Sequence, residues 1–532
     1  MSPPGSNQLI FQSLSNKQST VGNLCLILKV MATFAKSILT DQCLTMNFET
    51  PTYTSQTVLP GTFEAENHWY PKALNATLHP MVDFFLNLSN IRIIERYCHL
   101  HPGVDRDALK QLLEHKPKYF RWGGADLINV ATEKGKREMV VIENNSCPSG
   151  QKSMPLMIDH EEMGSYKHLI EKTFLPFLRS KTTPEKGGLA VIYDKNIMEA
   201  SGYAAVIAEL TKEKVHLTEF KDNIKPRAVR FHEGMMYVFG EDQHWHPIRA
   251  AFRYVTQRPW NRIPVLTKTK ILNPIIACLA GGRNKMIAAK AYDIFNAEYE
   301  EAGIHINTPE TIWDVTKAEI PLYVKMFGGH AVIKIPYSNA GQGVFTITSE
   351  KELKNFMELN HPYNQFIVQS LIGNYHWTSK GKKGKLYHVG TMPNIKGQSY
   401  VCDIRMMVCV GKEGITPLCL YGRRAAKHLE DTLSDSSDSW AILGTNLSRK
   451  LNEGNWDTDT NRLMLTDRRD FNKLGIGLDD LIEGFIQTIT SMIAIDNMAK
   501  LLINSKGELK PKLFLSLNND PQLIEEINQS MA

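Results

Sequence analysis

One group of residues in this 532-residue sequence has the types and spacing of a metal site. Glu143 and Asn145 end the strand-like run MVVIENN, and Asp126 lies on the strand-like run before it. Residues two apart on a strand share a face, and carboxylate and amide oxygens suit a hard cation such as Mg²⁺. We therefore predict a magnesium site formed by Asp126, Glu143 and Asn145, with a polar strand end in solvent as the alternative.

A second group could hold phosphates. Lys334 lies on the run HAVIKIP, and a glycine-rich turn and the strand-like run VFTIT follow it. The turn consists of Ser338, Asn339, Ala340, Gly341, Gln342 and Gly343. Backbone N–H groups of such a turn and one lysine can bind an anionic chain. A GK[ST] sequence and a following helix are missing, so the turn is neither a Walker A nor a Rossmann motif. An ordinary hairpin with a glycine-rich turn is the alternative.

A third group flanks the second. Lys285 opens a helical stretch, and Gln369 lies on the later strand-like run FIVQSLI. A lysine ahead of a phosphate-binding hairpin and an exposed strand edge behind it are what a nucleotide pocket needs. Taken alone, each residue is as well explained by exposure to solvent. Their order along the chain favours the nucleotide site.

The composition of the chain argues against nucleic-acid-binding and membrane proteins. The chain is 42% hydrophobic and 22% charged, and its 61 basic and 56 acidic residues are interspersed. We therefore expect a soluble protein of several packed units that binds no nucleic acid. The eight cysteines form no CxxC pair, which indicates reduced thiols and a cytoplasmic location. The apolar stretch 21–34 contains Asn23 and Lys29 and is too short to span a bilayer, so no membrane association is expected.

Hydrophobic periodicity predicts the elements that must position these residues. Helices are expected within 80–114, 273–300 and 478–498, and a strand-helix-strand unit over 187–220. Hairpins are expected from LINVAT with MVVIENN, and from AVRFHEG with MMYVFGED. The block 330–372 is predicted as strand, glycine-rich turn, strand, helix and strand. The runs SYVCDIRMMVCVG, ITPLCLYGRRA and a final KLFLSLN are predicted as further strands.

The order of these residues resembles the ATP-grasp superfamily, in which two α+β subdomains clamp ATP. Lys285, Lys334, the turn 338–343 and a hinge strand fall in the family's places. The hinge is formed by Gln369, Ser370, Leu371 and Ile372. The segments that carry the resemblance are ENNSCPSG, GGRNK and IKIPYSNAGQG, and it covers the chain from about residue 110 onward. The fold class expected is α+β or α/β, with a pre-ATP-grasp-like βαβ domain.

The metal strand of most ATP-grasp members comes last, near the C-terminus. Here Ser516 stands at the family's glutamate position, whereas Glu143 and the following Pro-Ser-Gly stretch come early. This order is similar to circularly permuted ATP-grasp families of the glutathionylspermidine synthetase type and the Pro-Ser-Gly type. Arg121 departs from the Arg-x-Asp spacing of the former type. Either the Glu143 strand or the late strand with Asn518 could hold the metal, and we favour Glu143 because a serine barely binds Mg²⁺.

The resemblance implies an ATP- and Mg²⁺-dependent ligase that joins a carboxylate to an amine or thiol through an acylphosphate. Asp403 and Arg405 look like the Asp-x-Arg strand of peptide-ligating members, and Thr445-Asn446-Leu447 looks like their Asn-Leu loop. Arg405 and Arg423 would stabilise the acylphosphate, and the substrate would be amino-acid or peptide-like. An ATP-grasp phosphotransferase and a non-catalytic ATP-binding protein remain the alternatives.

The expected organisation has five parts. Residues 1–45 would be a variable or disordered leader, and 46–180 a helical segment plus the metal-binding hairpin. The pre-ATP-grasp-like domain would span 181–270, the nucleotide-binding subdomain 271–375 and the C-terminal core subdomain 376–532.

Overall fold

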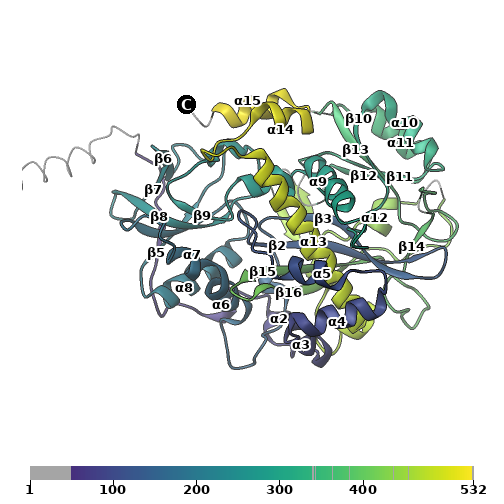
Figure 1. Ribbon diagram of the computed structural model, residues 1–532, viewed down its shortest axis with the longest axis horizontal. Helices are drawn as coiled ribbons and strands as arrows, with labels where there is room; N and C mark the ends of the chain where they lie inside the picture. The colour runs from purple at the N-terminus through teal and green to yellow at the C-terminus, as the bar shows by residue number, and fades with distance from the viewer. Residues whose placement is uncertain are drawn as a thin grey trace, which may run out of the picture. The chain divides into compact units, whose positions relative to one another are not determined.

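The computed structural model describes residues 50–529, except 338–340, 342, 362, 383, 435–436 and 453–454. Contacts divide the chain into Met1–Thr52 and Tyr53–Ala532, and the account below concerns the second unit. The leader predicted over 1–45 lies outside the described residues. The second unit contains helices and several sheets (Figure 1), so the predicted mixed α and β class is confirmed.

A seven-stranded sheet has the order β1-β5-β4-β8-β7-β6, with β9 paired to β8. Its strands are β1 (Gln56–Val58), β4 (Gly188–Tyr193), β5 (Val215–Glu219), β6 (Val229–His232), β7 (Met235–Phe239), β8 (Trp245–Tyr254) and β9 (Lys270–Leu272). β4 runs parallel to β5 and β8, and α8 (Ile197–Thr211) forms the crossover from β4 to β5. The predicted strand-helix-strand unit is thus confirmed, as is the hairpin of β6 and β7.

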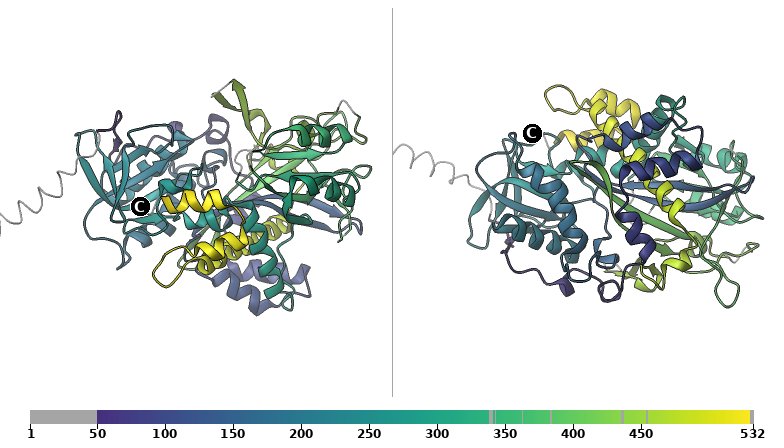
Figure 2. Two further views of the ribbon diagram at one scale, coloured as in Figure 1. Left: turned by 90° about the horizontal axis from the view of Figure 1, so that it is seen from above. Right: turned by 60° about the horizontal axis from the view of Figure 1, so that its bottom comes forward.

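A six-stranded antiparallel sheet has the order β14-β2-β15-β16-β19, with β3 paired to β2. Its strands are β2 (Trp122–Thr132), β3 (Arg137–Asn145), β14 (Leu386–His388), β15 (Cys402–Gly411), β16 (Gly414–Arg424) and β19 (Leu463–Met464). The long helix α13 (Leu478–Leu502) contacts β2, β3 and β15 (Figures 1 and 2). Strands from two distant parts of the chain, 122–145 and 386–464, therefore share one sheet.

A four-stranded antiparallel sheet has the order β10-β13-β11-β12 and its own hydrophobic core. Its strands are β10 (Thr311–Thr316), β11 (Ala331–Lys334), β12 (Val344–Ile347) and β13 (Gln365–Ser370). Two helices, α10 (Ile320–Met326) and α11 (Glu350–Glu358), pack on it. The predicted order of strand, turn, strand, helix and strand over 330–372 is confirmed, and Ser349 caps α11 by accepting the Glu352 N–H.

Helices predicted over 80–114 are present, and their caps explain their limits. They are α3 (Pro80–Leu86), α4 (Asn90–Leu100) and α5 (Arg106–Glu114). Ser89 and Asp105 cap α4 and α5 through side-chain oxygens. The other helices are α2 (Pro71–Leu74), α6 (Gly164–Leu169), α7 (Leu175–Leu178), α9 (Lys285–Glu298), α12 (Ser439–Leu443), α14 (Pro511–Leu517) and α15 (Pro521–Gln529).

Short structures complete the described chain. Single helical turns are formed by Ala65–Asn67, Gln151–Ser153, Ile170–Phe174, Trp260–Arg262, Cys278–Gly282, Lys317–Glu319, Thr460–Arg462 and Phe471–Leu474. β17 (Ser448–Asn452) and β18 (Asn455–Thr458) form a separate hairpin. The stretch 273–300 is therefore helical in two pieces, a turn at Cys278–Gly282 and then α9.

The strand predicted for KLFLSLN is wrong, because this run lies within α14 and its C-cap. Pro511 occupies the first helical position, where the missing N–H costs nothing. The buried residues are Phe514 and Asn518, which are four apart and hence on one face of a helix. The late strand that could have held the metal is thus absent from the part of the chain that the structure describes.

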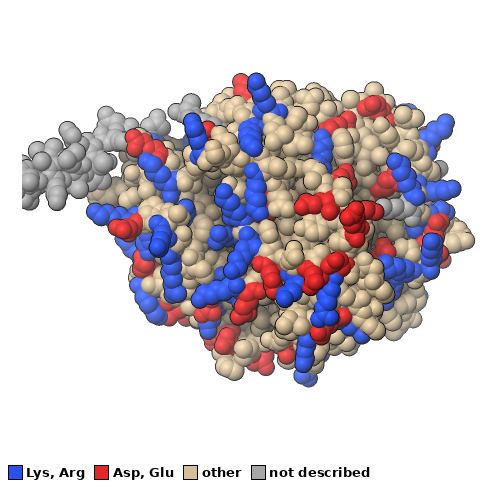
Figure 3. Space-filling model, viewed as in Figure 1, with Lys and Arg blue, Asp and Glu red and all other residues tan. Residues whose placement is uncertain are grey.

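Charges of both signs lie on the face shown in Figure 3. Lys and Arg side chains gather in a band left of centre, and Asp and Glu side chains gather to its right. Among the described residues, no helix is long and apolar enough to cross a membrane.

Candidate nucleotide and metal site

Glu143 lies near the end of β3, where a bulge interrupts the pairing with β2. Asp126 pairs with Glu143 and Leu127 with Val141, so Ile142 is the extra residue on β3. A bulge re-aims the backbone and side chains next to it. The Ile142 carbonyl oxygen consequently accepts a hydrogen bond from Lys334 Nζ at 3.2 Å, across the gap to the four-stranded sheet.

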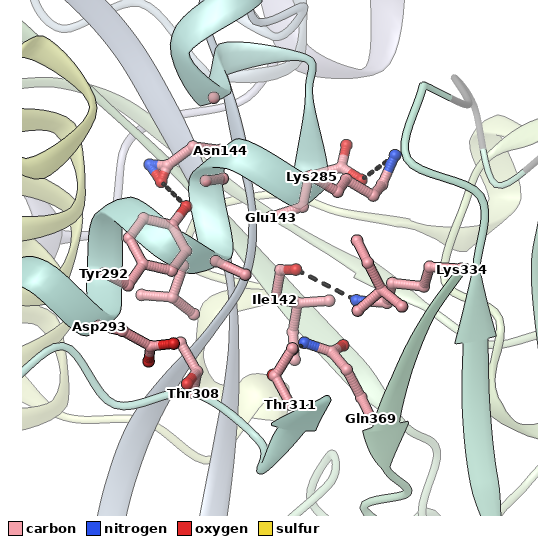
Figure 4. A pocket seen from close by; sticks show the side chains of 15 residues that line it. Ile142, Glu143, Asn144, Lys285, Tyr292, Asp293, Thr308, Thr311, Lys334 and Gln369 are labelled. Atoms are coloured by element: carbon pink, nitrogen blue, oxygen red, sulfur yellow. Dashed lines mark hydrogen bonds and ion pairs between the residues drawn. The ribbon is translucent and has the colours of Figure 1, made fainter. Parts of the chain in front are cut away.

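Lys285 reaches the same point from the start of α9. Asn284 caps this helix by accepting the Ile287 N–H, and the Lys285 N–H donates to the Pro336 carbonyl at 2.9 Å. The Lys285 Nζ lies 3.4 Å from Glu143 Oε2. Figure 4 shows the Lys285 and Lys334 side chains converging on the strand that carries Glu143. Two cations and one carboxylate, all distant in sequence, thus lie close together.

The glycine pair ahead of α9 explains how the helix comes so close to β3. The Gly282 carbonyl accepts the Ser146 N–H at 3.0 Å. A Cβ on Gly282 would lie 2.4 Å from the Ser146 Cβ, a distance that real Cβ atoms do not show. Only glycine therefore permits this contact, which fixes the start of α9 beside the strand of Glu143.

The charges in this site shift one another's protonation. Burial would raise the pKa of Glu143, but Lys285, with help from Arg283, outweighs it and holds this pKa below its usual value. Burial lowers the pKa of Lys334 to about 8, although Glu143 opposes the shift. Glu143 is therefore ionised at neutral pH. Lys334 is mostly charged, and an anion placed beside it would stabilise its charged form further.

A cavity lies between the four-stranded and six-stranded sheets and contains these groups. Its lining residues are Val141, Ile142, Glu143, Asn144, Gly281, Lys285, Ala288, Ala289, Tyr292, Asp293, Thr308, Thr311, Lys334, Ile367 and Gln369. Gln369 Nε2 donates to Thr311 Oγ1 at 2.8 Å, and Tyr292 Oη donates to Asn144 Oδ1 at 3.1 Å (Figure 4). The cavity encloses about 30 Å³, the volume share of one water molecule, so a nucleotide requires its walls to move apart.

The rest of the predicted hinge does not line this cavity. Ser370, Leu371 and Ile372 are buried behind Gln369. The Leu371 N–H donates to Ser379 Oγ at 2.7 Å, and the Ser370 N–H donates to the Glu310 carbonyl at 2.8 Å. These backbone groups are thus engaged within the protein in this conformation.

The glycine-rich turn is described in part. Ser338, Asn339, Ala340 and Gln342 lie outside the described residues. Gly341 and Gly343 have φ angles of +74° and +70°, which side chains rarely adopt. A Cβ on Gly341 would lie 2.9 Å from the Trp440 ring, so Gly341 lies against α12.

Asp126, Arg405, Asp403 and Arg423 form a buried ionic cluster on the six-stranded sheet. Arg405 lies opposite Asp126 in the pairing of β15 with β2, and Arg423 lies opposite Asp403 in the pairing of β15 with β16. Arg405 donates from Nε and Nη2 to the two Asp126 oxygens at 2.6 and 2.7 Å. Arg423 Nη2 lies 2.8 Å from Asp126 Oδ2.

This cluster bears on the predicted role of Asp126. Burial would raise its pKa, but Arg405 and then Arg423 hold it well below the usual range. Both of its oxygens already accept from guanidinium groups, so the carboxylate is committed to orienting the two arginines. Burial raises the pKa of Asp403, and Thr445 Oγ1 donates to Asp403 Oδ2 at 2.8 Å.

The donors available to a metal follow from these contacts. Glu143 is a carboxylate that opens on the cavity, whereas Asn145 is 1% exposed and absent from the cavity lining. Within the described ranges, no group of three or more His, Cys, Asp and Glu side chains could hold a metal ion. One carboxylate fits Mg²⁺ in the manner in which this ion is often bound, with phosphate oxygens and waters supplying the other positions.

Sequence reasoning missed Glu199, which the structure places against the loop that follows the Glu143 strand. Glu199 is fully buried and accepts from the Ser149 hydroxyl at 2.5 Å and from the Gly150 N–H at 2.6 Å. It thereby fixes the Pro-Ser-Gly loop that follows the Glu143 strand. A buried glutamate in the otherwise apolar helix IMEASGYAAVIAEL is the signal that could have shown it.

No protein-family model matches the sequence, and no curated protein matches it. Solved structures similar to this one include a glutathione synthetase-like effector from Globodera pallida, at 9% identity and a TM-score of 0.38 over 66% of this chain and 86% of that one. A RimK domain ATP-grasp protein from Sphaerobacter thermophilus has 12% identity and a TM-score of 0.26 over 44% of this chain and 89% of that one. D-alanyl-alanine synthetase A from Vibrio cholerae has 14% identity and a TM-score of 0.26, with the same coverage. These TM-scores are low and assign no function.

Proposed function

We propose that this chain binds Mg·ATP between its four-stranded and six-stranded sheets and uses it to activate a carboxylate. The observation that carries the proposal is the convergence of Lys285, Lys334 and Glu143 on one cavity, from three segments far apart in sequence. Two lysines neutralise phosphates, and one ionised carboxylate accommodates the accompanying cation. The two sheets correspond to the two α+β subdomains of an ATP-grasp fold in circularly permuted order.

The two cations act on the phosphates directly. Lys285 is fixed at the start of α9 and Lys334 at the end of β11, so their positions do not depend on the glycine-rich turn. Bound Mg²⁺, held by Glu143 and the phosphates, would neutralise charge that develops on the transferring phosphoryl group. Closure of the walls after ATP enters would exclude water from the reacting groups.

The reaction proposed has two steps. A carboxylate oxygen of the substrate attacks the γ-phosphorus and ADP leaves, which gives an acylphosphate. An amine or thiol then attacks the acyl carbon, and inorganic phosphate leaves as the amide or thioester forms. Arg405 and Arg423 are held rigidly by Asp126 and Asp403, which suits them to stabilise the anionic oxygens without reorganisation.

Phosphate release tests this function. Purified full-length protein is assayed with Mg·ATP and pools of amino acids, dipeptides and polyamines. Glu143→Gln is the test variant, and Glu138→Gln is the matched control, because Glu138 lies on the same strand outside the cavity. We expect release that depends on a pool, that falls by about 100-fold or more in Glu143→Gln and that is retained in the control.

Other outcomes would point elsewhere. A phosphorylated product without consumption of amine or thiol would identify a phosphotransferase. Binding of ATP without release from any pool would indicate a non-catalytic ATP-binding protein. Equal release by wild type and Glu143→Gln would remove Glu143 from the site.

A further inference from the structure

Lys195 lies at the carboxyl end of β4, between this strand and α8. β4 has parallel neighbours on both sides, β5 and β8, and α8 leads the chain to β5. The chain therefore leaves β4 toward β5, whereas it leaves β8 toward β9 on the opposite side. In open α/β sheets, ligands bind in the crevice at the carboxyl ends of the strands at such a point.

The surroundings of Lys195 are rich in positive charge. Its Nζ lies 5.7 Å from the centre of the Tyr254 ring at the end of β8. Burial, followed by the charges of Arg283 and Arg405, lowers the pKa of Lys195 to about 7. The lysine is half-buried, so part of its side chain is open to solvent.

The carboxylate that acts most strongly on Lys195 is already neutralised. This group is Asp194, whose Oδ2 lies 3.1 Å from Arg262 Nη2. The same oxygen accepts the Thr256 N–H at 2.9 Å and the Gln257 N–H at 2.8 Å. Across the part of the chain that the structure describes, Lys195 has no ion pair or hydrogen bond. Its charge is therefore left for a ligand to balance.

The loop after the Glu143 strand connects Lys195 to the nucleotide site. Arg283 Nη2 donates to the Cys147 carbonyl at 3.4 Å, and Arg405 Nη1 donates to the Ser149 carbonyl at 3.2 Å. Asn196, which follows Lys195, donates to the Ser149 hydroxyl at 3.0 Å. Two arginines and Asn196 thus contact the loop of residues 147–150, which lies between the Glu143 strand and the end of β4.

We propose that Lys195 binds a second anionic group of the acid substrate, so that the substrate is an acid with two anionic groups rather than a monocarboxylate. The inference rests on the proposed function, because the first carboxylate is the one that ATP activates near Arg405. The second group is a carboxylate or a phosphate, either of which forms charge-assisted hydrogen bonds with an ammonium. Arg283 adds to the field that attracts it.

Direct binding provides the first test. Full-length protein is saturated with Mg²⁺ and a non-hydrolysable ATP analogue, and calorimetry measures the affinity for three acid series. These are linear monocarboxylates, linear dicarboxylates of equal length and carboxylates that bear a phosphate. The variants are Lys195→Gln and Lys195→Arg, and the control is Lys212→Gln, an exposed lysine that pairs with Glu209 at the other end of α8.

We expect wild type to bind one of the two doubly anionic series about 10- to 100-fold more tightly than the monocarboxylates. Lys195→Gln should lose this preference, Lys195→Arg and the control should keep it, and affinity for the ATP analogue should not change. Which series is preferred distinguishes a carboxylate from a phosphate. Equal affinities for all series in wild type, or a preference that survives in Lys195→Gln, would overturn the inference.

Kinetics distinguish substrate binding by Lys195 from a purely structural role. With an acid that supports phosphate release, Lys195→Gln should raise KM for the acid by about 10-fold or more and leave kcat within about threefold. A loss of kcat at unchanged KM would instead assign Lys195 to proton transfer and reject the binding role. Failure of ATP to bind would refute the proposed function itself. ATP-dependent turnover with the same KM in wild type and Lys195→Gln would refute the inference alone.

Discussion

Arg405 lies directly opposite Asp126 in the six-stranded sheet, and its Nε and Nη2 atoms lie 2.6 and 2.7 Å from the two carboxylate oxygens. Both side chains are buried, so the two charges have lost most of their contact with water and have gained one bidentate ion pair instead. Removing one partner of such a pair leaves the other charge buried without compensation, which is more costly than losing an exposed pair. Asp126 thus holds Arg405 and Arg423 in place.

Asp126→Asn should therefore lower the free energy of unfolding by about 3 kcal/mol or more. Thermal and urea unfolding measure this loss. The control is Asp479→Asn, whose exposed pair with Arg96 should contribute about 1 kcal/mol or less. If Asp126 were instead a metal ligand, Asp126→Asn would keep its stability and would need far more Mg²⁺ for activity.

The sequence predicts the lysines and the glutamate of the site because each belongs to an element with strong local signals. Lys334 precedes a glycine-rich turn, Lys285 begins a helix, and Glu143 ends an apolar strand. In the structure all three line one cavity. The partner of Asp126 could not be predicted, because Arg405 is 279 positions away and only the strand order of the folded sheet places the two side by side.

The error at the C-terminus has a different cause. The leucines of KLFLSLN alternate, which favours a strand, yet the buried apolar side chain is Phe514 and not its neighbours Leu513 and Leu515. Pro511 starts a helix there, and packing of Phe514 against the core decides its orientation. Local alternation in a short run was outweighed by tertiary contacts. Similarly, Asn144 and not Asn145 lines the cavity, since the pattern of a strand does not say where its last residue will pack.

The burial of Glu483 leads to a prediction of how the stability of the protein depends on pH. This residue of α13 is 8% exposed, and burial raises its pKa to about 7. Because the folded-state pKa lies above the ordinary value of about 4.3, the folded protein keeps the proton that the unfolded chain releases. This contribution to stability is complete below about pH 4.3 and is lost as pH rises toward about 7.

Glu483→Gln should consequently stabilise the protein at pH 8, by on the order of 2 kcal/mol, and bring little gain near pH 4.5. Thermal unfolding at the two pH values measures the difference. Glu66→Gln, at an exposed position, is the control and should change stability little at either pH. The same gain at both pH values would mean that the ionisation of Glu483 is not responsible.

The close contact of Gly282 with Ser146 leads us to expect a link between the packing of α9 and nucleotide binding. A Cβ at this position would lie 2.4 Å from Ser146 Cβ and 2.5 Å from the Ala277 carbonyl oxygen. Gly282→Ala should therefore push the start of α9 away from β3, cost about 1–3 kcal/mol of stability and weaken ATP binding through Lys285. Unfolding and ATP titration measure the two effects.

Gly103→Ala is the matched control for this substitution, since no atom lies within 4 Å of a Cβ added there. It should leave both stability and ATP affinity unchanged. ATP affinity unchanged in Gly282→Ala, despite lower stability, would show that the position of Lys285 does not depend on this contact.

Ser516 decides whether the C-terminal segment takes part in metal binding. It lies exposed on α14, and its hydroxyl donates to the Leu513 carbonyl at 2.8 Å. A carboxylate at this position would point into solvent on a helix rather than toward Glu143. Ser516→Glu should therefore leave the Mg²⁺ concentration for half-maximal phosphate release unchanged. Ser516→Ala should behave in the same way. A tighter response to Mg²⁺ in Ser516→Glu would place the metal at the C-terminal segment, and Glu143→Gln would then retain activity.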